Sequence, residues 1–146
     1  MKGNSNIVGP EHRLPKSILD KAIKSTNEFG WRQEDFANVV EAARENQMAV
    51  IGGQVQYVMP DTTCELYWLS YDSENRKQNE DWNCYCHRSA NECIEKFNKL
   101  ISSVNIEKEA IENFEFLAHQ KKKDVNLSEH LAFMLYFDDT ETDSFL

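Results

Sequence analysis

A chain of 146 residues has the size of one ordinary domain, and it is long enough to bury about 70% of its unfolded surface without disulfides or metals. Hydrophobic residues make up 40% of it, which excludes a disordered chain, and 25 acidic against 16 basic residues give a net charge of −9. This charge disfavours nonspecific contact with nucleic acid and favours either a basic partner or simple solubility. We expect one domain over residues 1–146, with loose ends at 1–13 and 139–146.

The start of the chain lacks the apolar run of a signal peptide, and no stretch approaches the ~20 apolar residues of a membrane span. Three of the four cysteines are crowded into ten residues, which suits reduced thiols better than a disulfide framework. We therefore expect a cytoplasmic protein that makes no membrane contact. The four cysteines are Cys64, Cys84, Cys86 and Cys93.

In the first half of the chain, apolar spacing predicts two helices, at 15–30 and at 33–46. Residues 48–59 read as a strand with an imperfect period of two, interrupted by the pair Gly52-Gly53, which permits a bulge or a tight turn. A turn follows, and then a second strand at 64–71 that is rich in aromatic residues. The two strands are expected to pair as an antiparallel hairpin.

In the second half, a charged loop precedes the longest predicted helix, at 81–103, and another helix is predicted at 105–122. Residues 131–137 are continuously apolar, which favours a buried strand, although Ser128 and Glu129 would also suit the start of a helix. The predicted class is α+β, with a small antiparallel sheet (the central hairpin plus a C-terminal strand) packed against about four helices. Four aromatic residues are predicted to be largely buried: Tyr57, Trp82, Phe97 and Phe114.

The cysteines around His87 are the main candidate for a catalytic or metal site. Cys84 lies near the start of the long helix with His87 one turn away, as a thiol nucleophile and its base would be. Cys86 points about 200° away from Cys84, and a structural zinc site needs a second ligand pair that the chain does not offer. We expect buried, inert thiols at Cys86 and Cys93, no metal, no cofactor and no enzymatic activity.

Two acidic clusters are the candidate partner-binding residues. One follows Tyr71 in the central loop and the other follows Phe137 in the tail, and each of these aromatics would supply an apolar anchor if it were partly exposed. The loop cluster is Asp72, Glu74, Glu80 and Asp81, and the tail cluster is Asp138, Asp139, Glu141 and Asp143.

The stretch from 47 to 97 resembles small bacterial immunity proteins of polymorphic-toxin and contact-dependent growth-inhibition systems. The resemblance covers about a third of the chain, and its motifs are structural rather than chemical. They are a strand with a glycine pair at 48–57, an aromatic strand at 66–71, a helix opened by Asp81 and Trp82 with Tyr85 and Arg88 in it, and an earlier helix ending at 42–46.

The resemblance implies a non-enzymatic antidote that binds the toxic domain of a cognate toxin and blocks its active site or an adjoining surface. Many such toxins are nucleases with basic grooves, so the charge of −9 fits this role. The resemblance assigns no catalytic residue and no interface residue to this sequence. Two alternatives stay open: a small adaptor or regulatory domain for another protein, and a thiol-dependent or metal-dependent hydrolase.

Overall fold

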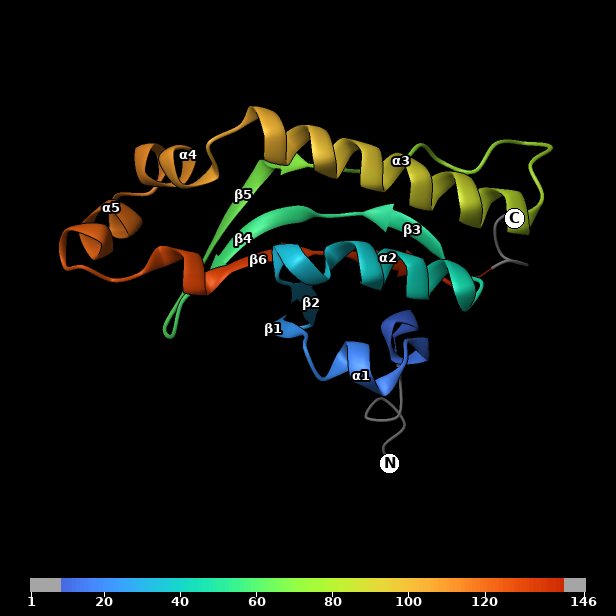
Figure 1. The fold of residues 1–146 in the computed structure, drawn as a ribbon, viewed down its shortest axis with the longest axis horizontal. Coiled ribbons are helices and arrows are strands. Elements are labelled where there is room, and N and C mark those ends of the chain that lie inside the picture. The colour runs from blue at the N-terminus through green and yellow to red at the C-terminus, as the bar shows by residue number, and fades with distance from the viewer. Residues whose placement is uncertain (1–8, 141–146) are drawn as a thin grey trace.

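The computed structural model describes residues 9–140 and has the α+β architecture expected from the sequence. A five-stranded antiparallel sheet has the order β1-β2-β6-β4-β5, and β3 pairs with β7 in a two-stranded extension (Figure 1). The strands are β1 (Ile23–Ser25), β2 (Glu28–Trp31), β3 (Ala49–Gly52), β4 (Gln54–Val58), β5 (Thr63–Ser70), β6 (Leu131–Met134) and β7 (Tyr136–Asp138). The α-helices are α1 (Lys16–Leu19), α2 (Phe36–Glu45), α3 (Trp82–Ser103), α4 (Ile106–Asn113) and α5 (Glu115–Lys122).

Two long segments, 49–58 and 131–138, form one antiparallel ladder that bends in the middle. Val55 pairs with Phe133 in β4 and β6, and Val50 pairs with Phe137 in β3 and β7. The register shifts by one residue between Val50 and Gly52, which is a β-bulge and increases the local twist. The bend therefore divides what the sequence predicts as single strands into β3 with β4, and β6 with β7.

The bend is a close crossing of two backbones that only glycine permits. A Cβ atom on Gly53 would lie 1.8 Å from the carbonyl oxygen of Met134, and Gly52 has a φ of +133°, which other residues rarely adopt. The hydroxyl of Tyr71 lies 2.7 Å from the Met134 oxygen and 3.1 Å from that of Gln54. This buried hydroxyl thus supplies a donor where the strand ladder is interrupted.

Helices α2 and α3 cover one face of the sheet, and strand β6 passes behind α2 in the view of Figure 1. Phe36 of α2 stacks on Phe97 of α3 with ring centroids 3.7 Å apart, and both rings meet Phe133 of β6 edge-on. Tyr71 meets the same two helical rings edge-on. These four aromatic side chains join the helices to the sheet at the centre of the core.

The opposite face of the sheet is concave, because the sheet curls until its two edge strands touch. Ser25 of β1 and Thr63 of β5 are hydrogen-bonded through their hydroxyls at 3.0 Å. Inside the curl, Glu28 accepts hydrogen bonds from Gln56 at 2.7 Å and from the Tyr136 hydroxyl at 3.1 Å. We refer to this side as the concave face, made by Glu28, Gln54, Gln56, Glu65 and Tyr136.

The predicted helix at 15–30 is wrong. It is limited to α1, and the hairpin of β1 and β2 follows, with Ile23 opposite Gly30. The apolar spacing is helical only as far as Ile23, while Phe29 and Trp31 then alternate with Gly30 as in a strand. Trp31 is fully buried and donates a hydrogen bond to the carbonyl of Ile18, which fixes the hairpin against α1.

The predicted helix at 105–122 is two helices, because Phe114 is extended (φ −128°, ψ 106°) and separates α4 from α5. Phe114 is only half-buried, so its predicted burial is wrong. The predictions for Tyr57, Trp82 and Phe97 are confirmed, as are the helices corresponding to α2 and α3 and the strand at 131–137. Within residues 9–140, no helix combines enough length with enough apolar character to cross a membrane.

Replacing Tyr71 with Phe should lower the free energy of unfolding by about 1–3 kcal/mol, because it leaves the buried Met134 carbonyl without its donor. Chemical denaturation measures this difference. The matched control is Tyr67→Phe, whose side chain is 71% exposed, and it should change the stability by less than about 0.5 kcal/mol. Equal stability of the two variants would contradict the role given to the Tyr71 hydroxyl.

Candidate protein-binding surface

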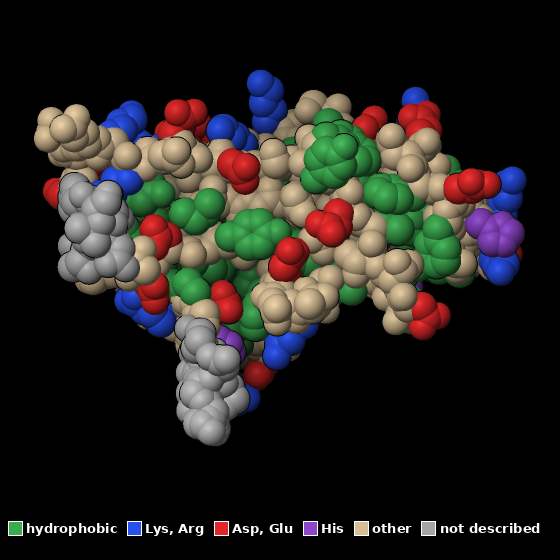
Figure 2. Space-filling model, turned by 180° about the vertical axis from the view of Figure 1, so that it is seen from behind, with side chains coloured by type: hydrophobic (Ala, Val, Ile, Leu, Met, Phe, Trp, Pro, Cys, Tyr) green, Lys and Arg blue, Asp and Glu red, His purple; other side chains and the backbone are tan. Residues whose placement is uncertain are grey.

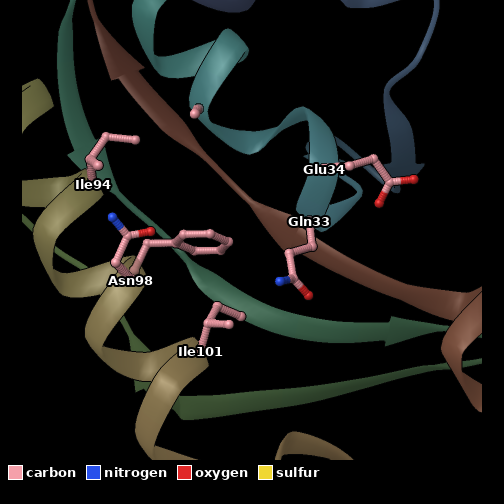
Figure 3. A pocket seen from close by; sticks show the side chains of 7 residues that line it. Gln33, Glu34, Ile94, Asn98 and Ile101 are labelled. Carbon is pink, nitrogen blue, oxygen red and sulfur yellow. The ribbon is translucent and has the colours of Figure 1, made fainter.

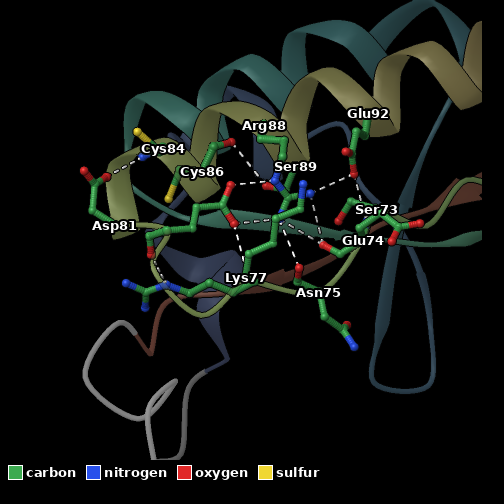
Figure 4. Close-up of polar contacts among 12 residues, drawn as sticks. Ser73, Glu74, Asn75, Lys77, Asp81, Cys84, Cys86, Arg88, Ser89 and Glu92 are labelled. Carbon is green, nitrogen blue, oxygen red and sulfur yellow. Dashed lines mark hydrogen bonds and ion pairs between the residues drawn. The ribbon is translucent and has the colours of Figure 1, made fainter.

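The acidic loop before α3 is held by its own contacts with Arg88 (Figure 4). The Arg88 guanidinium donates to both carboxylate oxygens of Glu80, at 2.5 and 2.8 Å, and to Glu92 at 2.9 Å. It also donates to the carbonyl of Asn75 at 3.1 Å, and the backbone N–H of Glu74 donates to Glu92. A bidentate pair of this kind is among the stronger polar contacts in proteins.

These contacts change the ionisation of both partners. The hydrogen bonds from Arg88 lower the pKa of Glu80 to about 2, and the same contact raises the pKa of Arg88. The side chain of Glu80 is only 11% exposed. Glu80 therefore stabilises the loop. Because Arg88 neutralises its charge within the molecule, Glu80 attracts a charged partner only weakly.

The two aspartates of the loop cluster also have structural contacts. The Asp72 carboxylate accepts a hydrogen bond from the backbone N–H of Gly53 at 3.0 Å, beside the strand crossing. Asp81 caps α3, since its carboxylate accepts from the N–H of Cys84 at 2.8 Å. Asp72, Glu74 and Asp81 remain solvent-exposed, so their predicted role in binding a partner stays a prediction.

The aromatic anchors proposed from the sequence are not exposed. Tyr71 is fully buried and Phe137 is 8% exposed, so neither meets the condition set for an anchor. In the tail, Asp138 accepts from the backbone N–H of Thr140, and Asp139 lies 3.7 Å from Arg13. The other two predicted tail residues, Glu141 and Asp143, lie outside the described residues.

Cys84 is exposed at the start of α3, but its surroundings do not activate it. The contact with the Asp81 carboxylate raises the pKa of the Cys84 thiol, which is opposite to what a nucleophile needs. His87 lies 3.3 Å from a guanidinium nitrogen of Arg44. Cys86 and Cys93 are buried, and burial raises the pKa of Cys93 to about 12. Among residues 9–140, no three His, Cys, Asp or Glu side chains gather as a metal site would require.

The most exposed large hydrophobic side chains of the sheet lie in a bulge of the edge strand β5. Ser70 pairs with Gln54 and Leu66 with Val55, so residues 67–69 have no counterparts in β4. Tyr67 is 71% exposed and Trp68 38% exposed. Bulges in edge strands turn side chains away from the regular alternation, and this one presents two adjacent aromatics to solvent.

Trp68 is held in a fixed orientation by α4 and the residue after it. Its indole N–H donates to the Glu109 carboxylate at 2.9 Å, and its ring stacks with Phe114 at a centroid distance of 6.3 Å. Tyr67 meets Trp68 edge-on at 5.3 Å. We refer to Tyr67, Trp68, Glu109 and Phe114 as the bulge surface.

From the sequence, Tyr67 and Trp68 are expected only to favour a strand. A signal was nevertheless present, because neighbouring strand residues point to opposite faces and two adjacent aromatics cannot both enter the core. Seen from behind, hydrophobic patches alternate with acidic side chains in the middle of the molecule, whereas Lys and Arg lie mostly toward the outline (Figure 2). This distribution suits a partner that offers both apolar and basic groups.

A separate hollow of about 400 Å³ lies between the start of α2 and the middle of α3 (Figure 3). Ile94, Phe97 and Ile101 provide its apolar lining, and Glu34 is its one titratable residue. Its lining therefore contains no nucleophile paired with a base, and nothing in it indicates catalysis.

Comparisons with known proteins do not identify the chain. It matches no family model, no curated protein and no solved structure.

The depressed pKa of Glu80 predicts a pH dependence of stability. Because the folded-state pKa of about 2 lies below the ordinary value of 4.5, Glu80 stabilises the fold above pH 4.5, and this contribution is lost as the pH falls toward 2. Glu80→Gln should be less stable than the wild type at pH 7 by about 1–3 kcal/mol, and the difference should shrink below pH 4. Denaturation at several pH values measures it, with Glu95→Gln on exposed α3 surface as the control. A stability difference between the wild type and Glu80→Gln that stays constant from pH 7 to 2 would contradict the lowered pKa of Glu80.

Cys84 should react slowly with iodoacetamide at pH 7.5 for an exposed thiol, because its raised pKa leaves little thiolate. Asp81→Asn removes the charge but keeps a residue able to cap α3, and it should increase the rate severalfold. Mass spectrometry of the modified peptide follows the reaction. A wild-type rate above that of a free-cysteine peptide would argue for an activated nucleophile.

Proposed function

We propose that this chain is a bacterial immunity protein that binds a cognate, basic toxin domain in the cytoplasm and neutralises it without catalysis. The observation that carries the proposal is the bulge surface, where Tyr67 is 71% exposed beside a fixed Trp68. Aromatic residues of this kind are the commonest energetic centres of protein interfaces.

The surroundings of the bulge favour a basic partner over a neutral one. The Glu109 carboxylate of the bulge surface contacts Trp68 directly, and the whole chain carries a net charge of −9. Complementary charge speeds encounter, while the desolvated aromatics set the dissociation rate. A toxin with a groove for nucleic acid would supply the positive surface.

The enzyme alternative receives less support. A thiol hydrolase would need Cys84 as thiolate, and the neighbouring Asp81 raises its pKa instead. An adaptor function would use the same bulge surface, so the identity of the partner separates it from immunity. The immunity function predicts a toxin domain encoded beside this chain, and that domain is the decisive reagent.

Co-expression with that toxin domain should restore cell growth, and Tyr67→Ala should weaken the complex. Truncating an interface aromatic at an energetic centre costs about 2 kcal/mol or more, so the dissociation rate should rise about thirtyfold, with the association rate nearly unchanged. Surface plasmon resonance measures both rates. Unchanged stability of Tyr67→Ala would show that the loss is not caused by unfolding.

The matched control is Asp72→Asn combined with Glu74→Gln, which neutralises two of the three exposed carboxylates of the loop cluster and leaves Asp81 to cap α3. If the bulge surface is the interface, this pair should slow association modestly and leave dissociation unchanged. If the loop variant dissociates fast while Tyr67→Ala does not, the interface lies at the loop. A wild-type chain that neither binds the toxin domain nor restores growth would refute the immunity function.

A further inference from the structure

The β1–β2 hairpin is anchored at its base, while its tip has little packing support. None of residues 21–29 is buried, whereas Gly30 and Trp31, which pair with β6, are fully enclosed. A hollow of about 480 Å³ lies between this hairpin and the turn that joins β4 to β5. Because protein interiors are close-packed, a space of this size beside the hairpin means that its tip gains little from apolar contacts.

Three hydrogen bonds connect the tip of the hairpin to strands across the concave face. The hydroxyls of Ser25 and Thr63 lie 3.0 Å apart, and the Glu28 carboxylate accepts from Gln56 and from the Tyr136 hydroxyl. When such bonds break, each group gains hydrogen bonds to water instead. The three bonds therefore stabilise the closed position of the hairpin only modestly.

Gln56 makes the closed position costly. Its side chain is 1% exposed, and its Nε2 donates to Glu28 of the hairpin. Its Oε1 is buried and has no donor within the part of the chain that the structure describes. A buried carbonyl oxygen without a donor is unfavourable, and movement of the hairpin away from Gln56 would let water supply one.

The backbone at the tip of the hairpin adds a second cost. Thr26 has a φ of +56°, which β-branched residues rarely adopt. Strain of this kind persists only where the surrounding contacts impose it. Since the tip makes few contacts, loss of the hairpin structure would release this strain.

We propose that residues 23–28 form a flap that opens while the rest of the domain stays folded. The flap begins after α1 and ends at Phe29, whose carbonyl accepts a hydrogen bond from Leu135 at 3.1 Å. Opening breaks the three hydrogen bonds, releases the strain at Thr26 and hydrates Gln56, and it exposes little apolar surface. Segments with few buried contacts are the ones that open locally in folded proteins. The flap does not depend on the proposed function, and its test needs no partner.

The test is exchange of the Gln56 side-chain amide protons with water, followed by NMR. If the flap opens by itself, these protons should be protected at least about a hundredfold less than the backbone N–H groups of β4, which is paired on both sides. Low concentrations of urea should accelerate exchange in β4 but not at Gln56, because flap opening exposes little surface. Equal protection and equal urea dependence at the two places would overturn the proposal.

Two variants should shift the opening in opposite directions. Ser25→Ala removes the bond to Thr63 and should accelerate exchange at Gln56 about twofold to tenfold. Thr26→Asn places a residue that tolerates positive φ at the tip and should slow this exchange about threefold or more. Ser102→Ala, the same change as at Ser25 but on exposed α3 surface, is the matched control and should have no effect. Exchange at Gln56 that neither flap variant alters would overturn the proposal, since another motion would then expose the amide.

Discussion

The structure depends on the crossing at which Gly53 meets the backbone of Met134. Only a residue without Cβ fits there, and the resulting break in the ladder is sealed by one buried hydroxyl, that of Tyr71. Because of the bend, the two halves of one antiparallel ladder lie in different parts of the fold. Strand β3 packs against α3, while β4 and β6 form the centre of the curled sheet. The concave face and the core on its other side both follow from this geometry.

The distribution of acidic residues follows from the same architecture. The segment after Tyr71 runs along β3 and then forms the loop around Arg88, so its carboxylates, Glu80 above all, neutralise internal donors. Glu109 lies instead beside the bulge of β5, where it accepts a hydrogen bond from Trp68 next to the exposed Tyr67. Net charge alone therefore does not locate a binding surface, because some of the acidic side chains form internal contacts that stabilise the fold.

The sequence predicts the class, the central hairpin, α2, α3 and the C-terminal strand, because these have strong and regular apolar periods. It fails at 15–30, where four residues of helical spacing precede a hairpin whose Trp31 is buried by distant strands. The bulge at Tyr67 and the contact of Ser25 with Thr63 depend on pairing between distant segments, which local spacing does not encode. The hollow between the β1–β2 hairpin and the turn that joins β4 to β5 could not be predicted for the same reason, since its lining comes from two separate parts of the chain, 24–28 and 56–65.

The most direct test of the account is the footprint of the partner on this chain. Cross-saturation NMR of the labelled protein, bound to the toxin domain that the proposed function requires, reports which amides lie at the interface. If the bulge surface is the interface, signal is lost around Tyr67 and Trp68, with little change from residue 74 to 81. A footprint centred on that loop, with Tyr67 unaffected, would contradict it.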